Sequence, residues 1–346
     1  MGASDGSRMT LGRRPNILVV LLNYRTPQMT LRAAEAALAD MAGTEATCEM
    51  VMIDNASGDG SGEILSQAIT ANGWDVQSRV RFVQSPINGG FGAGNNIGLQ
   101  MQMSDGTAPD YYYLLNSDAF PDAGCLGTLL RQLEITPQAG LAGSHVRGED
   151  DVDHTTAFRF PSIAGEFEGA ARFGPITRAL KHAVVAPDLP TKTTQVDWVA
   201  GASVLMRAAM LDAIGTFDET FFLYFEETDL CKRAARAGWQ CWYVPEARVV
   251  HIGSVSTGMK EWQRIPTYWY ESRRHYFVKN HGRAYAAAAF LAKLAGGALH
   301  ITRCALSRRT PEDPPGFYRD LIRFGLGLPA RQTPTLPHRP VSEEKS

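Results

Sequence analysis

In the first half of the chain, short apolar runs alternate with segments in which apolar residues recur with helical periodicity. The run Asn16–Leu22 is almost wholly aliphatic, which is typical of a strand buried in a parallel sheet. Thr26 and Pro27 predict a helix start, with Thr26 as the cap and Pro27 at the first position. The helix should continue to about Ala39, and residues 48–53 form a second apolar strand. This β-α-β order predicts an α/β fold.

Two further predicted strands are each followed by residues suited to binding a ligand. Val80–Gln84 precedes a loop rich in glycine and asparagine, residues 86–96, and a helix from Ile97 to about Met103. Glycines let the backbone approach a ligand closely, and N–H groups at a helix start suit phosphate. The loop lacks the glycine spacing of dinucleotide-binding and P-loop proteins. It is therefore a weak signal when taken alone.

The next strand, rich in tyrosine and leucine, ends in the triplet Asn116-Ser117-Asp118. A carboxylate at this place can hold Mg²⁺ or Mn²⁺, which prefer oxygen ligands and often bridge substrate phosphates. A plain turn after the strand is the alternative for this triplet. The same alternative applies to Asp54 and Asn55 after the second strand, which could shape a turn and cap the next helix.

An acidic cluster follows the aromatic run Phe221–Phe225 and opens an amphipathic helix that extends to Gly238. Acids at a helix N-terminus are stabilised by the helix dipole, so capping is one interpretation. Apolar surroundings favour another, because they raise the pKa of a carboxylate until it can act as a base near neutral pH. The cluster consists of Glu226, Glu227 and Asp229.

The carboxyl-terminal third is less regular. Residues 141–195 are expected to be mobile loops, because they are rich in Gly, Pro, Asp and Arg. Helices are predicted at Tyr268–Asn280 and Tyr285–Leu306. Three cations of the first of these helices, Arg273, Arg274 and Lys279, either meet phosphates or form a solvated face. Residues 285–309 either lie on an anionic membrane or pack on the catalytic domain.

Composition narrows the class of protein. The 346 residues are 44% hydrophobic, with a formal net charge of −2. This balance argues against nucleic acid as a main partner. Five scattered cysteines, without metal-type spacing, are typical of a reducing compartment. Residues 1–14 have no apolar run of the secretory type, and residues 329–346 have the composition of a disordered tail. We therefore expect a cytoplasmic protein.

Taken together and in order, these segments resemble glycosyltransferase family 2, and more narrowly its rhamnosyltransferase-like branch. The resemblance covers residues 16–281. The segments that carry it are Asn23-Tyr24, residues 51–57, 88–96, 114–118, 197–202 and 217–229, and the stretch 244–251 that ends in His251.

The resemblance implies a GT-A fold, which is a Rossmann-like, mixed and mostly parallel sheet flanked by helices, here with a helical appendage at the C-terminus. It also implies a nucleotide-diphosphate-sugar donor, a divalent metal (Mg²⁺ or Mn²⁺) and inversion at the anomeric carbon. The domain boundaries expected are a tail at 1–14, a catalytic domain at 15–281 with its nucleotide-sugar half at 15–120 and its acceptor half at 121–281, an appendage at 282–328 and a tail at 329–346.

The resemblance also implies roles for individual residues. Glu227 is the expected base, and Glu226 and Asp229 would orient the acceptor or tune Glu227. Asp118 would contact the metal or the diphosphate, with His251 as a second metal ligand; a core or surface histidine is the alternative for His251. The donor would be bound by Asn23, Asp54 (against the pyrimidine), Asn55, Asn88, Gly89, Gly90, Asn95, Asn116, Trp198 and Gly201.

The resemblance favours dTDP-L-rhamnose as donor, while galactofuranose, glucose and mannose stay open. The acceptor would be a glycan or a lipid-linked glycan, reached at the inner face of the membrane through residues 285–309, and the oligomeric state is open. Two other classes are weighed. A nucleotidyltransferase would need a basic, glycine-rich signature after the first strand, which residues 23–27 do not supply. A non-catalytic protein on the same fold would have a degenerate acidic motif, but here the acids are present.

Overall fold

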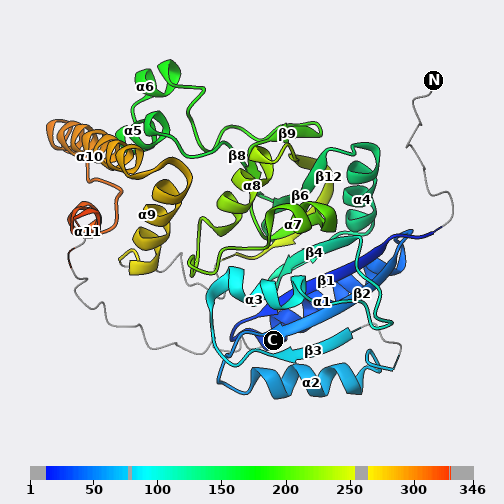
Figure 1. Ribbon diagram of the computed structural model, residues 1–346. Helices are drawn as coiled ribbons and strands as arrows, with labels where there is room; N and C mark the ends of the chain where they lie inside the picture. Colours follow the sequence, from blue (N-terminus) through cyan, green and yellow to red (C-terminus); the bar gives the residue numbers. More distant parts are fainter. Residues whose placement is uncertain (1–12, 77–79, 254–263, 327, 329–346) are drawn as a thin grey trace, which may run out of the picture.

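The computed structural model describes residues 13–76, 80–253, 264–326 and 328. The tail predicted at 329–346 and most of the one at 1–14 lie outside these residues. A ten-stranded mixed sheet forms the centre of the molecule, with helices on both faces (Figure 1). Its strands are β1 (Asn16–Asn23), β2 (Thr47–Asp54), β3 (Val80–Gln84), β4 (Tyr111–Asn116), β5 (Ala119–Pro121), β6 (Ala139–Arg147), β7 (Asp153–His154), β9 (Thr194–Val196), β11 (Ser203–Arg207) and β12 (Gln240–His251). Strands β8 (Ala157–Phe158) and β10 (Trp198–Val199) form a separate, antiparallel two-stranded sheet.

The helices include α1, which starts at Pro27 as the sequence predicts. Thr26 occupies the N-cap position as predicted, but its hydroxyl makes no capping bond and instead donates to the Ser117 hydroxyl at 3.2 Å. The helices are α1 (Pro27–Ala42), α2 (Ser61–Ala71), α3 (Gly90–Leu99), α4 (Cys125–Ile135), α5 (Ile163–Ala171), α6 (Gly174–Ala179), α7 (Ala208–Ile214), α8 (Glu226–Arg236), α9 (Thr267–His281), α10 (Arg283–Leu306) and α11 (Phe317–Gly325).

The sheet is parallel in its first half and mixed in its second. Strands β3, β2, β1 and β4 are neighbours in that order and run parallel. Strand β11 is antiparallel to both β4 and β6, and β12 is parallel to β6. Residues 17–21 of β1 are fully buried because helices cover both faces of this strand. The predicted α/β architecture, mostly parallel and flanked by helices, is therefore confirmed.

Two apolar cores lie on opposite faces of the sheet. Side chains of α1, α2 and α4 build one core, and side chains of α3, α7 and α8 build the other. The second core places α3, which follows the glycine-rich loop, and α8, which carries the acidic cluster, on the same face of the sheet. This face is therefore where a donor-binding loop and a catalytic acid can meet.

The expectation of mobile loops at 141–195 is wrong. Strand β6 lies inside the sheet, and α5 is a regular helix that is capped by the Ser162 side chain. Helix α5 packs along α10, and a Cβ at Gly296 would lie 2.9 Å from the Ala170 Cβ. Small residues here allow two helices to approach closely, so a glycine-rich composition reflects packing as well as loops.

The helical appendage consists of α10 and α11, which pack against α5 and α9 at the edge of the molecule (Figure 1). Helices α9 and α10 confirm both predicted helices, within two residues at each end. Within the described part of the chain, α10 alone is long and apolar enough to cross a membrane, judged by length and composition only. The boundaries between the predicted domains stay predictions.

Candidate active site

Polar residues gather where the parallel strands end. Asn23 at the end of β1 is paired in register with Asp54 at the end of β2, and Leu22 is paired with Asn116 at the end of β4. Ligands of open α/β sheets bind outside the carboxyl ends of the strands, so this edge is the expected donor side. The structure thus brings together three residues that lie far apart in the sequence.

Asp54 is held in a dense hydrogen-bond network. Its carboxylate accepts bonds from Asn23 Nδ2 (2.6 Å), Gln84 Nε2 (2.7 Å) and both the N–H and the hydroxyl of Ser57 (3.1 and 2.5 Å). Burial alone would raise the pKa of Asp54, but these bonds outweigh it and hold the pKa below its usual range. Asp54 is thus ionised, and it can contact a pyrimidine only if one of these donors gives way, since they occupy its lone pairs. Its contact with a base stays a prediction.

Asp118 and His251 lie side by side beyond β4 and β12. His251 Nε2 is 3.0 Å from Asp118 Oδ1 and 3.4 Å from Asn116 Nδ2. The described residues contain no group of three or more His, Cys, Asp or Glu side chains that could hold a metal. Magnesium commonly takes only one or two carboxylates and completes its shell with water and substrate phosphates. A carboxylate and an imidazole nitrogen therefore fit a metal that is completed by a diphosphate.

The glycine-rich loop docks on the aromatic segment that leads to the acidic cluster. Helix α3 begins at Gly90, seven residues before the predicted start at Ile97. The Phe91 N–H donates to the Phe222 carbonyl at 3.0 Å. Gly90 has φ +91°, and a Cβ there would lie 2.6 Å from the Phe222 carbonyl carbon. Glycine is thus required where the loop backbone meets the backbone of Phe222.

Asparagine amides hold the glycine-rich loop in shape. Asn55 Nδ2 donates to Asn88 Oδ1 and to the Gly90 carbonyl, both at 3.1 Å, and Asn88 Oδ1 also accepts from the Gly90 N–H. Gly89 is the residue that precedes the first turn of α3. The amide of Asn95 is bonded to the Phe91 carbonyl inside the helix. The Asn95 amide therefore has a structural partner here, and its predicted donor contact would require exchange of that bond.

Glu226 and Glu227 form a buried pair at the start of α8. Glu226 is 2% exposed, and within the described residues one oxygen of each carboxylate, Oε2, is buried without a hydrogen-bond partner. Burial raises the pKa of both carboxyls, and the charge of Glu227 raises that of Glu226 further. Tyr224 and Phe225, just before the pair, both have φ +70°, which is costly for residues with a side chain. Strain of this kind often occurs where a fold fixes functional side chains.

Glu227 lies next to the donor side. Its carboxylate has a backbone hydrogen bond with Gly201, and Glu227 Oε1 lies 3.7 Å from the place of a Cβ on Gly201. The next residue, Ala202, accepts a bond from the Asn116 N–H at 3.0 Å. The Gly201–Ala202 turn thus connects the acidic pair to the end of β4. A carboxylate with a raised pKa beside a diphosphate-binding edge can accept a proton from a hydroxyl group.

Trp198, three residues before this turn, packs within the protein as part of β10. Its indole N–H donates to the Arg159 carbonyl at 3.0 Å, and its ring stacks on Phe158 with centroids 4.2 Å apart. Its predicted contact with the donor stays a prediction.

Asp229 points away from the acidic pair, toward α9. It is fully buried and bonded to Arg233, Lys279 and Asn280 at 2.7–2.9 Å. These partners anchor α8 to α9, so Asp229 supports Glu227 through the helix and not through its own carboxylate.

The prediction that cations of α9 meet phosphates is wrong for two of them. Arg273 is buried and bonded to Glu166 at 2.7 Å, and Lys279 is bonded to Asp218 at 2.8 Å as well as to Asp229. These three carboxylates neutralise two cations that the helix would otherwise present to a ligand. Arg274 is exposed, and its role stays a prediction.

Sequence reasoning missed Asn96 and the pair of left-handed residues. The Asn96 side chain accepts a bond from the Phe217 N–H at 3.0 Å and donates to the Phe217 carbonyl at 2.9 Å. It thereby fixes the segment that leads to Glu226 against α3. Two asparagines in a glycine-rich loop were the available signal, but they suggested a ligand. Nothing in the local sequence marks the backbone of Tyr224 and Phe225 as left-handed.

Comparisons with known proteins match the chain to glycosyltransferases. Residues 17–184 match the family model of "Glycosyl transferase family 2". The N-acetylglucosaminyl-diphospho-decaprenol L-rhamnosyltransferase of Mycobacterium tuberculosis is 29% identical over 235 residues, which cover 62% of this chain and 70% of the relative. Rhamnosyltransferase WbbL of Escherichia coli K12 is 28% identical over 165 residues, covering 47% and 60%.

A solved structure shows the same architecture. The mannosyltransferase PcManGT of Pyrobaculum calidifontis, in complex with GDP-Man and Mn²⁺, superposes with a TM-score of 0.52 at 15% identity. The match covers 91% of this chain and 80% of the other. At this identity the likeness concerns the fold alone, and it confirms the predicted GT-A fold.

Proposed function

Because the chain belongs to glycosyltransferase family 2, in its rhamnosyltransferase-like branch, we propose that it moves L-rhamnose from dTDP-L-rhamnose to a hydroxyl of a lipid-linked glycan, with inversion at the anomeric carbon. Two relatives named as rhamnosyltransferases support the sugar. A relative whose printed name contains a diphospho-decaprenol carrier supports the class of acceptor.

The single observation that carries the proposal is the buried acidic pair beside the Gly201–Ala202 turn. Inverting transfer needs a base on the face of the sugar opposite the leaving group, as in inverting glycosidases. Glu227, with its pKa raised by burial, accepts the proton of the acceptor hydroxyl. The hydroxyl oxygen bonds to the anomeric carbon as the bond from that carbon to the diphosphate oxygen breaks, and the nucleoside diphosphate leaves. Glu226 keeps a second carboxyl close to Glu227, which resists the charging of both at once.

On the donor side, Asp118 and His251 would hold a divalent metal, with Asn116 beside them. Such a metal supplies positive charge to the departing diphosphate. The backbone of the glycine-rich loop, shaped by Asn55 and Asn88, would follow the outline of the donor. Asn23 and Asp54, which are bonded to each other, would contact the nucleoside at the same edge of the sheet.

The expected location of the enzyme in the cell follows from its proposed acceptor. A lipid-linked acceptor lies in a membrane, and residues 285–309 join an apolar helix to two exposed arginines, Arg308 and Arg309. Arg303 is engaged elsewhere, because it donates to the carbonyls of Ala171 and Arg172 at 3.1 and 3.2 Å. We expect a cytoplasmic enzyme held at the inner membrane face through this segment. Each arginine contributes about 1 kcal/mol near an anionic surface, and salt weakens the attraction.

The experiment is a donor panel. The protein is incubated with Mg²⁺ or Mn²⁺, a lipid-diphosphate-linked N-acetylglucosamine acceptor, and in turn the dTDP-, UDP- and GDP-linked sugars, and the glycolipid product is measured by mass spectrometry. Acceptor-dependent transfer of rhamnose alone is the expected result. Faster transfer of another sugar would overturn the choice of donor, and nucleotide binding without transfer from any donor would instead favour a non-catalytic protein.

A further inference from the structure

A cavity of about 320 Å³ lies at the edge of the molecule, apart from the donor residues. Helices α5, α9, α10 and the approach to α11 enclose it, and Tyr224 of the acidic segment forms part of its wall. This volume falls in the range of roughly 300–1,000 Å³ that is typical of small-ligand sites. Nothing in the proposed mechanism uses this cavity.

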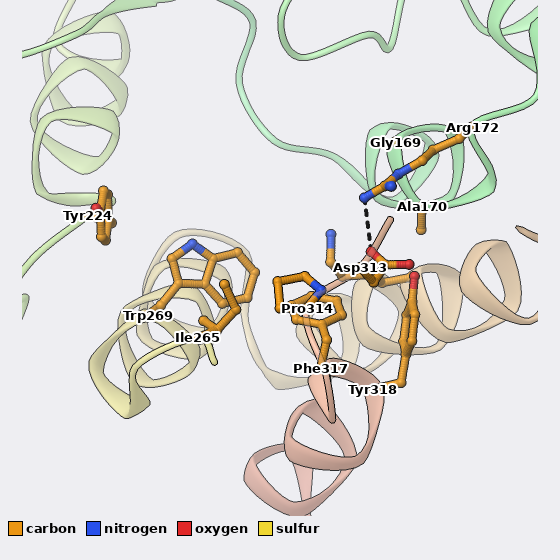
Figure 2. A pocket seen from close by; sticks show the side chains of 11 residues that line it. Gly169, Ala170, Arg172, Tyr224, Ile265, Trp269, Asp313, Pro314, Phe317 and Tyr318 are labelled. Carbon is orange, nitrogen blue, oxygen red and sulfur yellow. Dashed lines mark hydrogen bonds and ion pairs between the residues drawn. The ribbon is translucent and has the colours of Figure 1, made fainter. Parts of the chain in front are cut away.

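The walls of the cavity are mostly aromatic and apolar. Figure 2 shows the rings of Trp269, Phe317 and Tyr318 around its middle, with Ile265 and Pro314 between them. Trp269 and Phe317 lie with centroids 5.8 Å apart. Such a surface suits a hydrocarbon chain, because apolar area removed from water contributes about 25 cal/mol per Å².

One lysine in the wall shares its carboxylate partner with a second cation. Lys293 Nζ lies 6.0 Å from the ring centroids of both Trp269 and Phe317, and 3.3 Å from Glu166. Glu166 is shared with Arg273, which is closer, at 2.7 Å. Burial would raise the pKa of Glu166, but Lys293 and Arg273 outweigh it and keep the carboxyl ionised. Two cations thus share the single carboxylate of Glu166, and Lys293 makes the longer of the two contacts.

The cavity has a catalytic end and a distal end. In Figure 2, Tyr224 lies at one end, and the ion pair of Arg172 with Asp313 lies at the other. Tyr224 precedes Glu226 by two residues, so a ligand in the cavity would approach the acidic pair from the α9 side. Arg172 is neutralised by Asp313 at 2.9 Å and by Glu312 at 3.1 Å. Lys293, between the two ends, is therefore the cation available to an anionic ligand.

We propose that this cavity binds the diphosphate and the first isoprene units of a polyprenyl-diphosphate-linked acceptor, with the diphosphate at Lys293 and the isoprenoid on the aromatic walls. The proposal rests on the proposed function, whose acceptor it places. A neutral glycan would make no use of the Lys293 ammonium, and a bare anion would make no use of the aromatic walls. Helices α10 and α11 also carry exposed apolar side chains, among them Leu291, Leu306 and Ile322, against which the rest of the lipid can lie.

Farnesyl diphosphate is the probe, and its binding is measured by calorimetry with EDTA present, so that no metal-dependent site contributes. Lys293→Met should weaken its binding at least tenfold, and Lys293→Arg should restore most of it. Lys181→Met is the matched control, since Lys181 is exposed and remote from the cavity wall. Farnesol and inorganic pyrophosphate should each bind far more weakly than farnesyl diphosphate.

A second variant guards against loss of folding. Gly169 lines the cavity, lies in α5, and has nothing within 4 Å of the place of its Cβ. Gly169→Leu should therefore fold, fill part of the cavity and weaken farnesyl diphosphate binding at least fivefold. Binding of dTDP with Mg²⁺ should be unchanged in both variants, which shows that the donor side is intact.

Farnesyl diphosphate that fails to bind the unaltered protein would overturn the proposal. Equal binding by Lys293→Met and Gly169→Leu would overturn it too, as would pyrophosphate that binds as tightly as the lipid. These binding experiments do not measure sugar transfer. The assignment of the cavity and the proposed transferase function can therefore fail separately. Lys293-dependent lipid binding in a protein that transfers no sugar would support the cavity assignment and refute the transferase.

Discussion

The contact between Gly90 and Phe222 gives a sharp test of how the donor loop is joined to the acidic pair. Gly90→Ala would place a Cβ 2.6 Å from the Phe222 carbonyl carbon and 2.8 Å from its Cα, and closer still to its oxygen. Because backbone and not a flexible side chain lies there, relief requires movement of the loop or of the Phe222 segment. Either movement stretches the hydrogen bond from the Phe91 N–H to the Phe222 carbonyl.

The cost of Gly90→Ala can be summed from three effects. A residue with a side chain at φ +91° costs about 1–2 kcal/mol. The weakened hydrogen bond costs about 0.5–1.5 kcal/mol, and forced overlap in a packed region about 1–3 kcal/mol. The reduced freedom of the unfolded chain offsets about 0.4–1 kcal/mol. The free energy of unfolding should therefore fall by about 2–6 kcal/mol.

Gly106→Ala is the matched control for Gly90→Ala. Gly106 has φ +83° but nothing within 4 Å of the place of its Cβ, so it isolates the backbone cost of about 1 kcal/mol. Urea unfolding of the three proteins gives the two differences. Sugar transfer should also slow by about 10²-fold in Gly90→Ala alone, because a small displacement of catalytic groups lowers the reaction rate by about that factor. Equal destabilisation by the two variants, with equal activity, would refute a tight contact at Phe222.

Three further predictions concern the metal, the acidic pair and the membrane. Asp118→Ala should weaken the metal-dependent binding of the nucleotide product about tenfold or more without affecting metal-free binding, and an unchanged calorimetric affinity would remove Asp118 from the metal site. Glu226→Gln should raise the melting temperature more at pH 8 than at pH 5, because a pKa raised by burial means that stability from the protonated carboxyl is lost as pH rises; equal shifts at both pH values would contradict this. Reversal of both Arg308 and Arg309 to Glu should abolish flotation with anionic liposomes at low salt, and equal flotation would exclude an electrostatic attachment.

Much of the catalytic domain could be predicted because its signals are local. The apolar runs of β1, β2 and β4 are long enough to identify buried strands, and Val80–Gln84 matches β3 at both ends. The polar residues at the strand ends lie on one edge because parallel strands share their direction. The start of α3 at Gly90 was not predictable in this way. It depends on a partner, Phe222, that lies far away in the sequence.

The misread residues share a single physical cause, which is a distant partner of opposite character. Arg273 has the charge of a phosphate ligand, but Glu166, 107 residues away, neutralises it. Lys279 is likewise neutralised by Asp218, 61 residues away. The Asn96 side chain binds the backbone of Phe217, 121 residues away. Charge and amide patterns identify the groups that can bind a ligand, whereas the fold decides which of them are already bound.

The most direct test of the central claim is the transfer rate of Glu227→Gln, measured with donor and acceptor at saturation. Glutamine has nearly the same shape but cannot accept the proton of the hydroxyl. The rate should fall about 10²–10⁴-fold, as is typical when a general base is removed. Near-normal transfer by Glu227→Gln would contradict the assignment of Glu227 as the base on which the proposed mechanism depends.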